Sequence, residues 1–206
     1  MPTSAQDLFA SLQARVVKLD RTRDRVERLF ASKQMLKFDV EQIYSGLYLD
    51  SFVSLERYVE ELFMGYLTGK VIAASRRVKP KVSFQTSQLA KDVLFSGNKY
   101  LDWIPYRYTI ERAGIYFNNG YPFSIITRQQ MALLEELHRI RNALAHRSEH
   151  SHDIFLRLVV GGLPLRPSEK KPASFLRSSL RANPPQTRLE NYLAEMLGIA
   201  QQLSRG

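Results

Sequence analysis

Apolar side chains recur every three or four positions between about Leu36 and Leu67, and this periodicity restricts the fold more than any other feature of the sequence. It is the spacing that keeps one face of an α-helix apolar. The periodic positions are Ile43, Leu47, Leu55, Val59, Leu62 and Tyr66. Gly69 lies where such a helix would stop. We therefore expect one long helix that forms the spine of the fold.

Further segments carry the signals of helices. Ser4 with Asp7, and Thr127 with Gln130, have the spacing of capping boxes, and helical periodicity follows each pair. The expected helices cover about residues 4–30, 87–95, 106–117, a segment from 127 onward, and about 187–203. The segment DIFLRLVVGG after His152 fits a short helix and a strand equally well. The pattern predicts an all-α protein, an antiparallel bundle of four to five main helices.

The length of 206 residues is typical of one domain, so we expect a single helical domain over residues 1–206. Two segments lack helical periodicity and are rich in proline, serine and basic residues. We expect loops in these segments, near residues 70–86 and 163–186.

The chain contains no cysteine, which excludes disulfides, a thiol nucleophile and cysteine-bound zinc. Its start, MPTSAQDLF, lacks the basic and apolar regions of an export signal, and no run of about 18 apolar residues occurs. These features fit a reducing compartment, and we expect a cytoplasmic protein without a membrane partner.

The net charge of +10 is concentrated in two segments. Residues 70–81 carry five basic side chains and no acid, and residues 166–188 carry six basic side chains against one glutamate, so each segment contributes +5. Concentrated Lys and Arg side chains favour a polyanionic partner, because neutralised phosphates release counterions. The alternative is a pair of solvated loops.

All four histidines lie in one stretch, HRIRNALAHRSEHSH, which runs from His138 to His152. Histidine changes charge near neutral pH and is a common metal ligand. On an ideal helix His138, Asn142 and His146 share one face, whereas Arg141 and His146 lie roughly 140° apart around the axis. We therefore expect Arg141 to flank the face that carries the histidines.

The sequence Arg141-Asn-Ala-Leu-Ala-His146 resembles the R-x4-H motif of the HEPN superfamily (higher eukaryotes and prokaryotes nucleotide-binding), in which Asn commonly follows the Arg near the end of a late helix. The segment DSFVSLERYVE, from Asp50 to Glu60, is similar to an early helix of the family that often carries an acidic residue facing the motif. The resemblance covers about residues 36–155. Some members carry a tyrosine two residues after the histidine, where a partner nucleotidyltransferase modifies it, and this chain has Ser148 instead.

The resemblance implies an α-helical bundle that dimerises and brings two motifs together in a cleft. Many members are metal-independent endoribonucleases that act as toxins or antiviral effectors. His146 would then be the general acid or base on the ribose 2′-hydroxyl or the leaving oxygen, and Arg141 would stabilise charge on the phosphate. Asn142 would orient neighbouring groups or contact the substrate, and Glu56 would hold Arg141 in place.

No metal or cofactor is implied by the resemblance. The expected partners are RNA, a second copy of the chain, and an antitoxin or defence-system protein. The basic segments would hold the RNA, because Lys and Arg bind phosphates without regard to sequence. The candidate RNA-binding residues are Arg76, Arg77, Lys79, Lys81, Arg147, Lys170 and Lys171.

The motif residues also have structural alternatives. Arg141 could be a surface arginine that pairs with Glu136 or Glu56, and Glu56 could be a solvated charge. His146 could sit at the end of its helix because a partly charged imidazole favours the negative end of the helix dipole.

Two further alternatives concern function. His146, His150 and His152 could ligate a metal ion, since histidines at i and i+4 can converge on one ion. The chain could also be a non-catalytic module of the same family, which binds RNA, a nucleotide or a partner protein and uses Arg141 and His146 only structurally.

Overall fold

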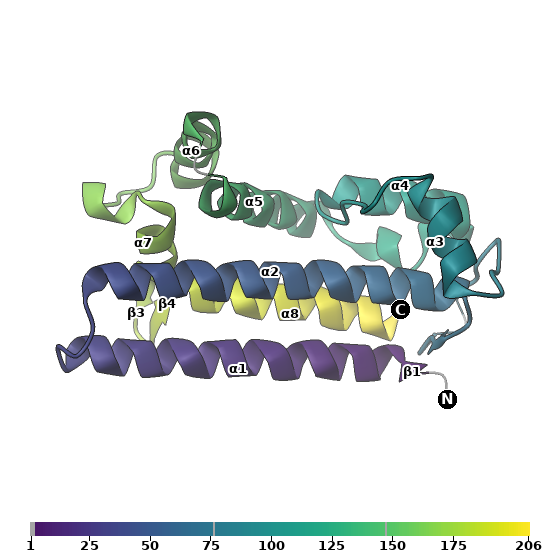
Figure 1. The fold of residues 1–206 in the computed structure, drawn as a ribbon, viewed down its shortest axis with the longest axis horizontal. Coiled ribbons are helices and arrows are strands. Elements are labelled where there is room, and N and C mark those ends of the chain that lie inside the picture. The colour runs from purple at the N-terminus through teal and green to yellow at the C-terminus, as the bar shows by residue number, and fades with distance from the viewer. Residues whose placement is uncertain (1–2, 76, 147) are drawn as a thin grey trace. The chain divides into compact units, whose positions relative to one another are not determined.

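The computed structural model describes residues 3–75, 77–146 and 148–206, and in these residues the protein is all-α, as the sequence predicts (Figure 1). The helices are α1 (Ala5–Ala31), α2 (Lys37–Leu67), α3 (Ser87–Phe95), α4 (Tyr106–Tyr116), α5 (Arg128–Ala145), α6 (Glu149–Phe155), α7 (Pro172–Arg177) and α8 (Arg188–Arg205). The strands are β1 (Thr3–Ser4), β2 (Val71–Ile72), β3 (Ser179–Ala182) and β4 (Pro185–Thr187). No described helix combines the length and the apolar character that crossing a membrane requires.

Two helices begin at the capping boxes that the sequence predicts. The Ser4 hydroxyl accepts a hydrogen bond from the Asp7 amide at 3.0 Å, and the Asp7 carboxylate accepts one from the Ser4 amide at 2.9 Å. Before α5, the Thr127 amide donates to the Gln130 side chain at 2.9 Å, and the Gln130 amide donates to the Thr127 hydroxyl at 3.2 Å. Each pair satisfies backbone groups that lack partners inside the helix. Both expected helix starts are therefore confirmed.

The chain divides into two compact units, which we describe separately. The first unit comprises Met1–Gln13, Ser54–Glu135 and Leu197–Gly206, and the second comprises Ala14–Val53 and Glu136–Met196. Helices α1, α2, α5 and α8 each contribute one part to each unit. The single domain expected from the chain length stays a prediction.

An aromatic cluster around Phe63 forms the core of the first unit. The Phe63 ring centroid lies 4.9 Å from that of Phe123, 5.0 Å from that of Phe117 and 5.1 Å from that of Trp103. Edge-on and tilted ring pairs at these distances add to the stabilisation that burial gives. The indole of Trp103 donates a hydrogen bond to the carboxylate of Glu60 at 3.1 Å, which satisfies its N–H group. The C-terminal part of α2 is thereby held against the segment before α4.

Side-chain contacts join four helices in the second unit. They link Tyr44 to Glu27, Tyr48 to the carbonyl of Leu137, Tyr192 to Glu136, and Arg23 to Glu190. The Tyr48 hydroxyl is fully buried and donates to Leu137 at 2.7 Å, so α2 holds the backbone of α5 directly. This bond lies one residue before His138, so it fixes the helix that carries the R-x4-H motif.

The segment expected as a loop near residues 163–186 is instead structured, and that prediction was wrong. It contains a short 3-10 helix (Pro167–Glu169), α7, and the antiparallel hairpin of β3 and β4. Phe175 and Leu176 on α7 explain why this segment is structured, because burial of their apolar side chains stabilises it. The high content of proline, serine and basic residues in the segment does not indicate this burial.

Backbone contacts hold the segment near residues 70–86 at several points. β2 pairs in parallel with β1, and Pro80 forms an isolated bridge with Phe117. The Lys81 amide donates to the carbonyl of Tyr116 at 2.8 Å. The ambiguous segment after His152 is helical, because α6 continues into a π-helical turn over Leu156–Val160.

Candidate functional site

The R-x4-H motif lies at the C-terminal end of α5, in the second unit. Arg141 and Asn142 occupy its last turns, and Ala145 is its last residue. His146 follows directly, and its amide still donates to the carbonyl of Asn142 at 2.8 Å. The ring of His146 is exposed, whereas Arg141 and Asn142 are half-buried. The motif therefore presents its histidine to solvent from a fixed helix end.

The side chains of Arg141 and His146 meet, although an ideal helix separates them around the axis. Nη1 of Arg141 lies 3.1 Å from Nε2 of His146. Two features explain the difference from the expectation: His146 follows the last helical residue, and the arginine side chain is long enough to reach around the helix. The structure thus joins the two residues that the motif singles out.

Hydrogen bonds connect Arg141 further, to Asn142 and then to His138. Nη1 of Arg141 donates to Oδ1 of Asn142 at 3.0 Å, and Nδ2 of Asn142 lies 3.3 Å from Nε2 of His138. The directions follow from chemistry, because a guanidinium and an amide NH₂ can only donate. Each contact is therefore a hydrogen bond in the tautomer of the histidine that carries its proton on Nδ1 and leaves Nε2 as the acceptor. Sequence reasoning placed His138 on the right face but gave it no role.

Buried contacts from two other helices hold α5 in place. Leu137 and Ile140 are fully buried on the side of α5 that faces the core. Burial raises the pKa of Tyr48 well above its ordinary value, so its hydroxyl remains a donor to the Leu137 carbonyl even at alkaline pH. The Tyr192 hydroxyl donates to the carboxylate of Glu136. Glu136 was one alternative partner for Arg141, and in the structure its carboxylate receives this bond from α8.

The segment after the motif begins a new helix. Ser148 is the N-cap of α6, and its hydroxyl accepts a hydrogen bond from the amide of Ser151 at 3.3 Å. Its role is that of a helix cap, for which serine is strongly preferred. His150 and His152 lie exposed on α6. Among the residues that the structure describes, no three His, Asp or Glu side chains come together in a group suited to a metal ion.

Two sets of predicted site residues fall elsewhere. Glu56 is half-buried on the part of α2 that belongs to the first unit, whereas the motif belongs to the second. The role of Glu56 in holding Arg141 stays a prediction. Arg76 and Arg147 lie outside the described residues.

The remaining candidate RNA-binding residues are exposed. They are Arg77, Lys79 and Lys81 in the first unit and Lys170 and Lys171 in the second. Lys81 also has a structural contact, because its ammonium group donates to the carbonyl of Gly114 near the end of α4 at 2.6 Å. A cation at this position is favoured by the negative end of the helix dipole.

Two basic residues of the segment 166–188 are used inside the fold. The guanidinium of Arg177 lies 4.2 Å from the ring centroid of Phe30, and that of Arg188 lies 4.8 Å from the ring centroid of Phe175. Arg188 also donates to the hydroxyl of Ser178 at 3.1 Å. Part of the positive charge of this segment therefore lies in packed contacts within the fold, and the rest lies on the surface.

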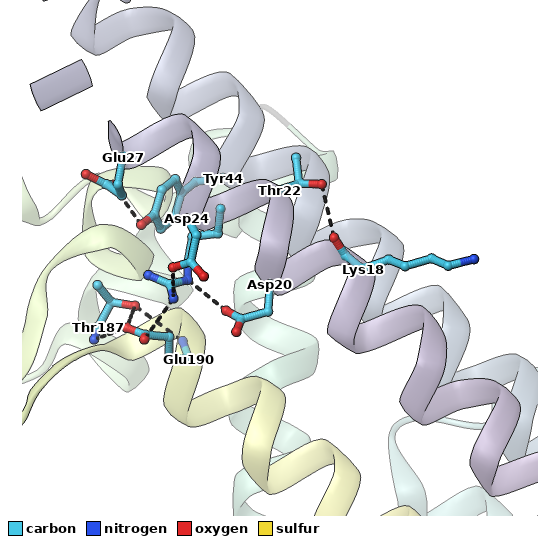
Figure 2. A network of polar contacts seen from close by, with 9 residues as sticks. Lys18, Asp20, Thr22, Asp24, Glu27, Tyr44, Thr187 and Glu190 are labelled. Carbon is cyan, nitrogen blue, oxygen red and sulfur yellow. Dashed lines mark hydrogen bonds and ion pairs between the residues drawn. The ribbon is translucent and has the colours of Figure 1, made fainter. Parts of the chain in front are cut away.

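A second polar cluster lies in the same unit, where α1 approaches the start of α8 (Figure 2). The side chain of Arg23 is only 10% exposed and contacts three carboxylates. They belong to Asp20 at 2.8 Å, Asp24 at 2.8 Å and Glu190 at 2.9 Å. A buried cation with paired charges is a structural element, since removing one partner would leave a charge uncompensated. The charged run DRTRDRVER at residues 20–28 contains Arg23 and two of these carboxylates.

An open pocket of about 310 Å³ in the second unit does not include the motif. Its charged lining residues are largely paired with each other. Glu41 accepts from the hydroxyl of Ser174 at 2.7 Å and lies 3.5 Å from the amine of Lys37. We therefore place the candidate site at the end of α5, where donors and an accepting imidazole nitrogen lie near solvent.

Comparison of the chain with protein-family models, curated proteins and solved structures finds no match.

Proposed function

We propose that the protein is a metal-independent endoribonuclease of the HEPN type, which cleaves RNA through attack of a ribose 2′-hydroxyl on the neighbouring phosphate. One observation carries the proposal: Nη1 of Arg141 and Nε2 of His146 lie 3.1 Å apart at the exposed end of α5. This pair combines a fixed cation with a group that exchanges protons near neutral pH. Both are needed when a phosphate accumulates charge as a proton moves.

The two side chains have separate roles in this reaction. The neutral imidazole of His146 accepts the proton of the 2′-hydroxyl, or its protonated form delivers a proton to the leaving oxygen. The guanidinium of Arg141 binds the phosphate oxygens as their negative charge grows. When a phosphate draws Arg141 away, Nε2 of His146 is released to act as the base. Attack by the ribose hydroxyl needs no metal-bound water.

The reaction also supports a homodimer. Transfer of a phosphoryl group benefits from both a base and an acid, and one motif supplies one exposed histidine. Pairing of two copies across a two-fold axis would supply both, and such dimers are the commonest assembly of soluble proteins. We further propose RNA as the substrate, a cytoplasmic location, and a role in a toxin–antitoxin or phage-defence system.

Incubation of the purified protein with total RNA, with and without EDTA, tests the proposal. We expect cleavage in both samples, with products that end in a 2′,3′-cyclic phosphate. Arg141→Ala should abolish most of the cleavage. Arg139→Ala is a matched control, because it removes the same charge from a half-buried position of the same helix.

The closed contact between Arg141 and His146 also favours a second candidate, a non-catalytic module that binds RNA, a nucleotide or a partner protein. In such a module the two side chains satisfy each other and stabilise the helix end. Intact RNA under varied salt, pH and metal conditions, with retained RNA binding, would support this second function and contradict the first.

A further inference from the structure

We propose that His138 is a positioning residue of the site, which orients Asn142 and through it the guanidinium of Arg141. This inference deepens the proposed ribonuclease function and rests on it. The R-x4-H pattern assigns no role to His138, because this residue lies outside the motif. The structure links it to the motif through the side chain of Asn142.

The geometry of the chain of contacts sets the direction of each bond. Nδ2 of Asn142 donates to Nε2 of His138 at 3.3 Å, so the opposite end of the amide, Oδ1, faces Arg141. With the amide turned by 180°, two NH groups would point at each other and the bond to Arg141 would be lost. The tautomer of His138 that leaves Nε2 unprotonated therefore favours the amide orientation that accepts from Arg141.

The ring of His138 is itself restrained. His138 is half-buried, and its ring centroid lies 6.4 Å from that of Phe52, with an interplanar angle of 32°. Phe52 is fully buried on α2 within the same unit. A half-buried ring beside a core phenylalanine has few orientations open to it, so the position of its Nε2 relative to Asn142 is defined.

The bond from Arg141 to Asn142 determines which edge of the guanidinium remains for a phosphate. Nη1 carries two hydrogens, and the two contacts of Nη1 are with Oδ1 of Asn142 and Nε2 of His146. Neither contact uses Nε or Nη2. These two nitrogens form the edge that binds two phosphate oxygens at once. Orientation of Asn142 by His138 thus presents this edge to the substrate.

Two substitutions at position 138 distinguish positioning from general stability. The side-chain oxygen in His138→Gln reaches about as far as Nε2 and accepts from Asn142, whereas His138→Asn is one bond too short. We expect single-turnover cleavage to fall about 10- to 100-fold in His138→Asn, which is the range of loss when the outer hydrogen-bond partners of metal-binding side chains are removed. KM should change little, and His138→Gln should restore most of the rate. In an Asn142→Ala background, His138→Asn should have no further effect.

Nuclear magnetic resonance of the full chain, labelled with ¹⁵N in arginine and histidine, gives a readout independent of cleavage. We expect the Arg141 side-chain signal to shift in His138→Asn and to stay near its original position in His138→Gln. Cleavage and Arg141 signals that are the same in both variants and the unmodified protein would overturn the inference. If the unmodified protein cuts no RNA, the proposed function fails, and the Arg141 signal alone then tests the role of His138. A shift of this signal confined to His138→Asn supports the inference. An unshifted signal overturns it.

Discussion

Arg177 on α7 forms a two-point ion pair with Glu27 on α1, across 150 residues of sequence. Nε and Nη2 of Arg177 lie 2.8 Å and 3.0 Å from the two carboxylate oxygens of Glu27. The hydroxyl of Tyr44 donates to the same carboxylate at 2.8 Å. The pair therefore fastens the basic segment after residue 163 to the helices of the second unit.

Loss of this ion pair should destabilise the protein. Arg177→Met keeps an unbranched apolar side chain over Phe30 but leaves the half-buried carboxylate of Glu27 without its charged partner. We expect the free energy of unfolding to fall by about 1–3 kcal/mol, measured by chemical denaturation. Arg166→Met removes an exposed charge from the same segment and should change the stability by less than about 0.5 kcal/mol. Equal effects of the two substitutions would contradict the structural role of Arg177.

The same ion pair predicts a dependence of stability on pH. Burial alone would raise the pKa of Glu27, but hydrogen bonds from Arg177 and Tyr44 outweigh it and lower this pKa below its ordinary value of 4.5. The stabilisation from Glu27 is therefore complete above about pH 4.5 and is lost as the pH falls through the folded pKa. In Glu27→Gln, denaturation measured between pH 7 and pH 3 should show a smaller loss of stability. The exposed Glu149→Gln should follow the unmodified protein, and an unchanged slope in Glu27→Gln would contradict the prediction.

The hydroxyl of Tyr48 should contribute to the attachment of α5. Tyr48→Phe removes a buried donor to the carbonyl of Leu137 while the ring stays in place. We expect a loss of about 1–2 kcal/mol in the free energy of unfolding. Tyr100→Phe is a control for the substitution itself, since Tyr100 is 75% exposed. A Tyr48→Phe protein as stable as the control would mean that the bond does not hold the motif helix.

Neutralisation of the exposed basic residues should weaken RNA binding. We expect a variant with glutamine at Arg77, Lys79, Lys170 and Lys171 to bind single-stranded RNA of different sequences more weakly. The salt dependence of log K should become shallower by up to about 3, because each lost phosphate contact contributes about 0.7. The control replaces four exposed cations of α1, namely Lys18, Arg21, Arg25 and Arg28, with glutamine. Equal weakening by both sets would show that net charge alone, and not these segments, binds RNA.

Much of the fold follows from local sequence patterns. The spacing of apolar residues predicts α2 within a residue of the observed ends, because a helix that buries one face must repeat that spacing. The capping box at Thr127 predicts the start of α5 for a similar reason. These signals act within a few residues, so the sequence shows them directly.

Other features depend on contacts that no local pattern contains. The helix α7 is held by Glu27, far away in the sequence, whereas the basic composition of its segment favours a loop. The contact of Arg141 with His146 was missed because an ideal helix does not describe a residue that follows the helix end. His138 was visible as a neighbour of Asn142 at i+4, but only the hydrogen-bond directions link it to Arg141.

Cleavage of RNA by His146→Ala under single-turnover conditions tests most directly whether the R-x4-H motif is a ribonuclease site. We expect the rate to fall by about 100- to 10,000-fold while RNA affinity stays nearly unchanged, because a positioned acid–base group contributes that much. EDTA should have little effect on the unmodified protein, and the exposed His150→Ala and His152→Ala should cleave nearly as fast as it does. Activity that EDTA abolishes and zinc or manganese restores, with equal losses in all three histidine variants, would instead identify a metal site and contradict the proposed role of Arg141 and His146.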